Sequence, residues 1–187
     1  LLLLLGILLT GLLLLGWSFD GGVRLFGLGL AGLALWLGRH DIARRTVKQA
    51  GLTRFIAICL LTGYVWLGIS GLSAMWFGGV PVGPQYDATL HAFFLGFVFA
   101  MIFAHAPIIF PAVLGARMTY RPLFYAHVVL LQVTLVVRLI GDAAGWSAGR
   151  QVGGLLNAVT LLLFLINTVS ALQSPPERVG TAQGRGA

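Results

Sequence analysis

The stretch that decides the fold runs from Phe55 to Phe77 and reads FIAICLLTGYVWLGISGLSAMWF. It contains no charged residue, and it is at least as long as the run of about 20 apolar residues that a helix needs to cross a bilayer. Segments of the same kind fill most of the chain on both sides of it. This stretch therefore predicts a helix whose solvent is lipid, and the rest of the sequence follows the same pattern.

The apolar segments predict an all-α, polytopic integral membrane bundle of about six transmembrane helices. The predicted spans are Leu1–Trp17, Gly22–Gly38, Phe55–Phe77, about Tyr86 to Leu114, Pro122–Ile140 and Val152–Leu172. Residues 1–174 would form this bundle, and residues 175–187 would be a disordered cytoplasmic tail after the Ser-Pro-Pro stop. Because the chain opens inside an apolar run and without Met, we expect the bundle to be incomplete at its N-terminus.

The composition excludes a soluble fold. Hydrophobic residues make up 58% of the chain and charged residues only 9%, against roughly a quarter charged in a soluble domain. The 26 glycines suit membrane helices, in which they allow close approach of neighbouring backbones. The single cysteine, Cys59, excludes an internal disulfide and any zinc or iron–sulfur site built from cysteines.

Charge predicts the orientation in the membrane. If the loop from Arg39 to Arg54 is cytoplasmic, alternation across six spans puts most of the 12 Lys and Arg residues on that side, as the positive-inside rule requires. These residues are Arg39, Arg44, Arg45, Lys48, Arg54, Arg117, Arg121, Arg178 and Arg185. We therefore expect a bacterial-type cytoplasmic (inner) membrane, a cytoplasmic C-terminus and no nucleic-acid partner for the net charge of +7.

Histidines inside the spans are the first candidates for function, because ionisable groups are costly in lipid. His91 and His105 share the fourth span. At 100° and 1.5 Å per residue, their spacing turns through about 1400° and rises about 21 Å. The two imidazoles are thus expected on nearly the same face, one near each membrane surface. Gly96 lies between them and would let a flat porphyrin approach the helix.

A third histidine, His127, lies near the start of the fifth span. Because the connection between spans four and five is short, the two spans should form a hairpin that places His127 at a depth similar to that of His105. These two imidazoles are candidate ligands for one haem b iron or one copper ion, with His91 a ligand of an outer haem or copper. The alternative is that each histidine simply hydrogen-bonds a neighbouring helix or carbonyl.

Arg138 is the remaining costly residue, near the outer end of the fifth span and about level with His91. Asp142 follows at i+4, so an ion pair is expected. Arg138 is either an anchor paired at the surface or a clamp for an anion, such as haem propionates or a quinone carbonyl. Arg39-His40-Asp41 is expected to be an interfacial charge cluster.

The stretch from Asp87 to Asp142 contains Leu90-His91-Ala92-Phe93-Phe94-Leu95-Gly96, then Met101 and later Gly115-Ala116-Arg117. It resembles the His-Ala-x-x-x-Gly…Met…Gly-x-Arg run of the NnrS family, nitric-oxide-response membrane proteins that bind haem and copper. The resemblance implies an all-helical membrane fold with His91 as a cofactor-binding residue. In that family a second histidine comes just before the closing Gly-Arg region, whereas here His105 comes earlier, shortly before Pro107 and Pro111.

These observations predict a haem-binding redox or electron-transfer protein, or a subunit of a respiratory-type membrane complex, with other membrane subunits as partners. Two other classes stay open. One is a non-catalytic subunit that binds pigment, lipid or quinone. The other is a small-solute transporter that uses a helix broken at Pro107 and Pro111. The residues assign no enzymatic reaction and no catalytic side chain.

Overall fold

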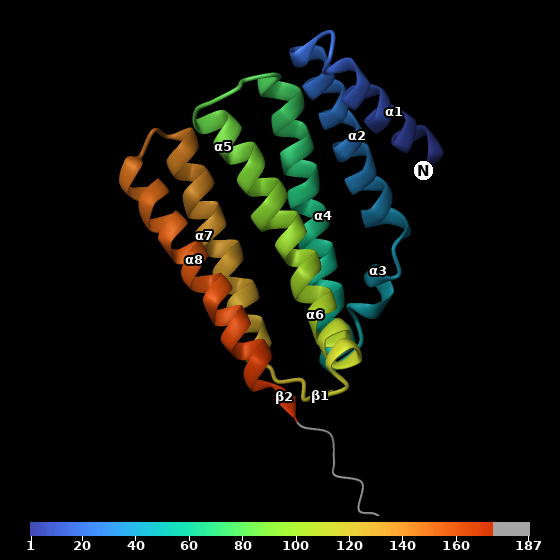
Figure 1. Ribbon diagram of the computed structural model, residues 1–187, viewed down its shortest axis with the longest axis vertical. Helices are drawn as coiled ribbons and strands as arrows, with labels where there is room; N and C mark the ends of the chain where they lie inside the picture. Colours follow the sequence, from blue (N-terminus) through green and yellow to red (C-terminus); the bar gives the residue numbers. More distant parts are fainter. Residues whose placement is uncertain (174–187) are drawn as a thin grey trace, which may run out of the picture.

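The computed structural model describes residues 1–173, and the predicted tail, with Arg178 and Arg185, lies outside the described residues. Helices account for most of the described chain (Figure 1). In order they are α1 (Leu2–Leu14), α2 (Phe19–His40), α3 (Ala43–Thr46), α4 (Gly51–Phe77), α5 (Pro84–His91), the π-helix η1 (Ala92–Val98), α6 (Phe99–Leu114), α7 (Phe124–Ala143) and α8 (Ser147–Ser170). Two short strands, β1 (Arg117–Met118) and β2 (Leu172–Gln173), pair antiparallel.

The prediction of an all-α membrane bundle is confirmed. Five helices are long and apolar enough to span a bilayer: α2, α4, the continuous helix Pro84–Leu114, α7 and α8. The first predicted span, however, forms only the 13-residue α1, which is about 20 Å long and shorter than a hydrocarbon core of about 30 Å. Its helix ends early because Ser18 caps α2, its side chain accepting a hydrogen bond from the Gly21 amide at 3.3 Å.

Two long helices form the centre of the bundle. α4 and the long helix α5–η1–α6 lie side by side, with the α1–α2 hairpin packed on α4 and the α7–α8 hairpin on the other flank (Figure 1). One end, which we call the basic end, holds α3 and the β1–β2 pair (Figure 1). The opposite end, the far end, holds the α1–α2, α4–α5 and α7–α8 connections. The described members of the predicted basic set thus share one end of the bundle.

Glycines bring α2 and α4 into backbone contact. A Cβ added to Gly71 would lie 2.6 Å from the backbone nitrogen of Ala31 and 2.7 Å from the carbonyl oxygen of Gly27. A Cβ at Gly27 would equally lie 2.7 Å from the Gly71 carbonyl oxygen. Small residues of this kind are how membrane helices maximise packing without a hydrophobic driving force.

The expected break at the two prolines is not seen. Pro107 and Pro111 both lie inside α6, which continues to Leu114. Phe103, whose carbonyl loses its helical partner to Pro107, is only 1% exposed and packs inside the protein. The irregular stretch is η1 instead, where hydrogen bonds of the i→i+5 type replace those of the α-helix.

Candidate functional site

A cluster of five charged or titratable side chains joins three helices at the far end. It comprises Asp87 and His91 of the long helix, Arg138 and Asp142 of α7, and Arg150 of α8, and we call it the far-end cluster. Nη2 of Arg138 pairs with Oδ2 of Asp87, while its Nε lies 3.7 Å from Oδ2 of Asp142. The other oxygen of Asp142 lies 2.7 Å from Nε of Arg150. The cluster therefore ties α5, α7 and α8 together.

Asp142 is the centre of this cluster. Its side chain is only 1% exposed and sits between two guanidinium groups, so its charge is matched inside the protein. The predicted i,i+4 pair with Arg138 is present, and Arg138 lies level with His91 through their common partner Asp87. The predicted spans end at Ile140 and begin again at Val152, whereas α7 continues to Ala143 and α8 begins at Ser147, so that Asp142 and Arg150 both lie in helices.

Arg138 has its guanidinium occupied from several sides. Besides Asp87 and Asp142, Nη1 of Arg138 donates to the Arg150 carbonyl oxygen at 3.3 Å. An added anion, such as a propionate, would have to compete with two carboxylates of the same chain. The geometry therefore favours the anchor interpretation of Arg138 over the anion clamp.

His91 and His105 present their rings in the same local way. Nδ1 of His91 lies 2.8 Å from the Asp87 carbonyl oxygen, and Nδ1 of His105 lies 2.7 Å from that of Met101. A backbone carbonyl can only accept, so Nδ1 carries the proton and the lone pair is on Nε2 in each neutral ring. Ligating histidines are held in this manner, with one nitrogen bound to a carbonyl and the other open to a metal.

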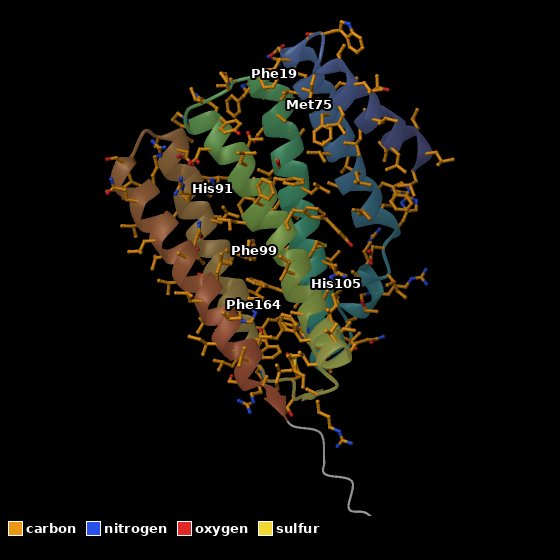
Figure 2. All side chains as sticks on the ribbon, viewed as in Figure 1. Phe19, Met75, His91, Phe99, His105 and Phe164 are labelled. Carbon is orange, nitrogen blue, oxygen red and sulfur yellow. The ribbon has the colours of Figure 1, made fainter. Side chains whose placement is uncertain are left out.

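The two histidines nevertheless face different surroundings. His91 belongs to the far-end cluster and pairs with Asp87, whereas His105 is on the exposed surface of α6, farther down the same helix (Figure 2). The expected alignment on one face is not found. The reason is η1, which lies between them: a helix closed by i→i+5 bonds turns less per residue than an α-helix, so the face shifts.

His127 is buried, only 2% exposed, in a box of aromatic rings. Its ring centroid lies 4.7 Å from that of Phe103 and 5.3 Å from that of Phe164, and Phe55 and Phe124 complete the box. Asn167 approaches Nδ1 at 3.5 Å, and Nε2 has no hydrogen-bond partner among the described residues. The nearly perpendicular Phe103 ring suits a weak N–H···π contact. The structure thus does not bring His105 and His127 together.

Gly96 packs closely against the side chain of Trp66. A Cβ there would overlap the indole of Trp66, so the glycine makes room for this ring. Nε1 of Trp66 in turn donates to Oε1 of Gln132 on α7. The small residue that the sequence assigned to a porphyrin face therefore serves a contact between α4, η1 and α7. Among residues 1–173, no group of three or more His, Cys, Asp or Glu side chains is arranged to hold a metal ion.

A cavity of about 330 Å³ lies on the other face of α5, near the far end. Phe19, in its wall, marks it at the top of Figure 2. Its wall is almost entirely apolar and comes from α1, α2, α4, α5, η1 and the loop after α4. The aromatic members are Phe19, Phe26, Phe77, Tyr86, Phe93 and Phe94. Its size falls in the range of ligand pockets, roughly 300–1,000 Å³.

In a comparison with known families, residues 1–173 match the family described as Domain of unknown function (DUF8744). The chain belongs to the DUF8744 family. Searches of curated proteins and of solved structures gave no match.

Sequence reasoning on this DUF8744 member missed two features of the site. It paired Arg138 with Asp142 but not with Asp87, although Asp87 lies one turn before His91 and so shares its side of the helix. It also missed the cavity, whose lining residues come from segments as distant as Leu12 and Phe94. No local pattern marks such a cavity, because each segment contributes only ordinary apolar residues.

Proposed function

We propose that this protein is a membrane subunit that binds an isoprenoid quinone and takes part in electron transfer. The observation that carries the proposal is the aromatic-lined cavity between α2, α4 and α5.

For the orientation, we propose that the basic end faces the cytoplasm of a bacterial-type inner membrane, as the positive-inside rule favours. A topology reporter fused at Lys48 tests that side directly, and a reading outside the cytoplasm would refute it.

The lining of the cavity favours a ring over a plain acyl chain. Aromatic side chains prefer offset or edge-to-face packing on a flat ring, and six of them border this cavity. Four polar residues also line it. Ser70 and Thr89 already donate to the carbonyl oxygens of Thr89 and Gln85. By contrast, the Gln85 and Tyr86 side chains make no hydrogen bond to another described residue. Their amide and hydroxyl groups are donors suited to quinone carbonyl oxygens. A hydrocarbon acyl chain has no hydrogen-bond acceptor with which such donors could pair.

The cavity lies near the far end, and residues of α1, α2, α4, α5, η1 and the loop after α4 line it. Because these helices are apolar, we propose that the isoprenoid tail of a bound quinone extends between them into the bilayer. The wall residues Val23 of α2 and Leu90 of α5 come from helices that face each other across α4. A quinone held here would lie on one face of α5, with the far-end cluster on the other.

Filling the cavity tests this proposal. Val23→Trp adds an indole to its wall, and we expect the quinone that co-purifies with the protein to fall about tenfold, since overpacking costs about 1–3 kcal/mol. Quinone per protein is measured by chromatography of organic extracts. Leu28→Trp is the matched control, because Leu28 lies on the same helix, is 43% exposed and does not line the cavity. Retention of phospholipid alone, without quinone, would refute the quinone proposal.

A second candidate function, haem binding, is favoured by His105. This imidazole is exposed on α6 at a shallow hollow of about 340 Å³, lined by Val98, Met101, Ile102, His105, Ala106, Ile109 and Phe110. An ionisable side chain on an apolar face is a default candidate for a site, and its carbonyl-bound Nδ1 leaves Nε2 open. The residues fit one axial ligand of a haem b, or one ligand of a copper ion, and the opposite ligand would come from another subunit. Haem supplies a one-electron carrier.

The reduced-minus-oxidised spectrum of the purified protein tests haem binding. We expect His105→Ala to abolish the haem α-band, because it removes the ligating nitrogen. His40→Ala is the control, since the His40 ring is bound in the same way, with Nδ1 2.9 Å from the Trp36 carbonyl oxygen, but lies at the basic end. The sequence-based pair of His105 and His127 requires that both changes remove the same band. A colourless wild-type protein excludes haem.

A further inference from the structure

At the basic end, three arginines converge on one hollow. The hollow has a volume of about 530 Å³ and is lined by Arg39, His40, Asp41, Ile42, Arg44 and Arg45. These residues come from the end of α2, the turn after it and α3. We propose that this hollow binds the phosphate of an anionic phospholipid headgroup, of the phosphatidylglycerol type, at the membrane surface.

The three arginines of the hollow carry positive charges that no carboxylate of the described residues pairs with. None of Arg39, Arg44 and Arg45 forms an ion pair within residues 1–173. Arg44 only donates Nη1 to the Arg39 carbonyl oxygen at 3.2 Å, which holds the two residues close. A guanidinium fork matches a phosphate through two parallel hydrogen bonds, so three such groups around one hollow form a suitable receptor.

The one carboxylate of the hollow is engaged elsewhere. Oδ1 of Asp41 accepts from the Ala43 amide at 2.7 Å, and Oδ2 accepts from the Tyr64 hydroxyl at 2.6 Å. Asp41 thereby caps the start of α3 and fixes this turn against α4. The carboxylate serves to shape the hollow, and the arginines remain available for a ligand.

The position of the hollow selects a lipid phosphate over a dissolved one. It lies where the spanning helices α2 and α4 leave the apolar layer. Ile42 at its edge is 69% exposed, and Trp36 stacks on His40 with ring centroids 4.9 Å apart. Aliphatic and indole groups beside cations are typical of the headgroup boundary. Basic pockets at this level bind anionic headgroups.

The test uses the whole chain in nanodiscs of phosphatidylcholine and phosphatidylglycerol in equal amounts. Native mass spectrometry measures the ratio of the two lipids that stay bound. We expect wild-type protein to retain phosphatidylglycerol preferentially, and Arg44→Gln/Arg45→Gln to reduce that preference about tenfold. Lys48→Gln/Arg54→Gln removes the same charge from the same end outside the hollow, and it should leave the preference within about twofold.

Each other outcome decides against the proposal. Equal loss in both double variants would mean that general surface charge, not the hollow, attracts the lipid. Displacement of the bound lipid by inorganic phosphate would assign the hollow to a soluble anion, and equal retention of the two lipids in wild type would exclude headgroup recognition. Should the double variant fail to fold, Arg44→Lys replaces it: the charge stays but the fork is lost, so an unchanged preference would refute phosphate binding by Arg44.

Discussion

Replacing Arg138 with Gln is expected to lower the free energy of unfolding by about 3 kcal/mol. The change removes the main partner of Asp87 and one of the two partners of Asp142, whose side chain is 1% exposed. A charge left buried without its partner is strongly destabilising, typically by about 3–5 kcal/mol, and here Arg150 retains part of the compensation. Unfolding in mixed micelles, followed by circular dichroism, measures the effect.

A double-mutant cycle separates the ion pair from other effects of the change. Arg138→Gln combined with Asp142→Asn should cost about 1–3 kcal/mol less than the sum of the single changes, because residues in one network couple by this amount. Arg24→Gln is the comparison at the same end: Arg24 pairs with Asp20 at 2.8 Å, both side chains are about half exposed, and Nη1 of Arg24 also donates to the Met75 carbonyl oxygen at 2.6 Å. Exposed pairs contribute about 0–1 kcal/mol. If Arg138→Gln costs no more than Arg24→Gln, the far-end cluster does not hold the helices together.

Gly71→Ala is expected to disrupt the packing of α2 on α4. The added Cβ would lie 2.6 Å from the backbone nitrogen of Ala31 and 2.7 Å from the Gly27 carbonyl oxygen. Both are backbone atoms, so the helices must separate, at a cost of about 1–3 kcal/mol or more. The same unfolding experiment measures it, and a cysteine cross-link between α2 and α4 should form more slowly in the variant.

Gly68→Ala provides a matched comparison three residues earlier on α4. Its Cβ would lie 3.6 Å from the Ala34 Cβ, an ordinary van der Waals contact. We expect this change to be neutral or slightly stabilising, because alanine loses less conformational freedom than glycine in a helix. Equal effects of Gly68→Ala and Gly71→Ala would show that backbone contact at Gly71 does not hold the two helices.

Apolar length was enough to predict the class of the protein. Because a lipid solvent demands long uncharged helices, the stretches around Phe55–Phe77 and Pro122–Ile140 could be recognised as helices without any tertiary information. The pair between Arg138 and Asp142 could be predicted for a similar reason, since i,i+4 neighbours on one helix must meet. The errors at the N-terminus and between α7 and α8 concern helix ends, which caps and partners on other helices decide.

What the amino-acid order could not reveal is which side chains from different helices meet. His91 and His105 were expected on one face, but the i→i+5 bonds of η1, which lies between them, rotate one relative to the other. The surroundings of His127 depend on Phe103 and Phe164, which arrive from two other helices. The cavity near Phe19 and the hollow at Arg44 likewise form only where residues from separate segments come together. Local patterns record periodicity along one helix, whereas cavities and clusters depend on the rotation and approach of several helices, and these are set only by packing.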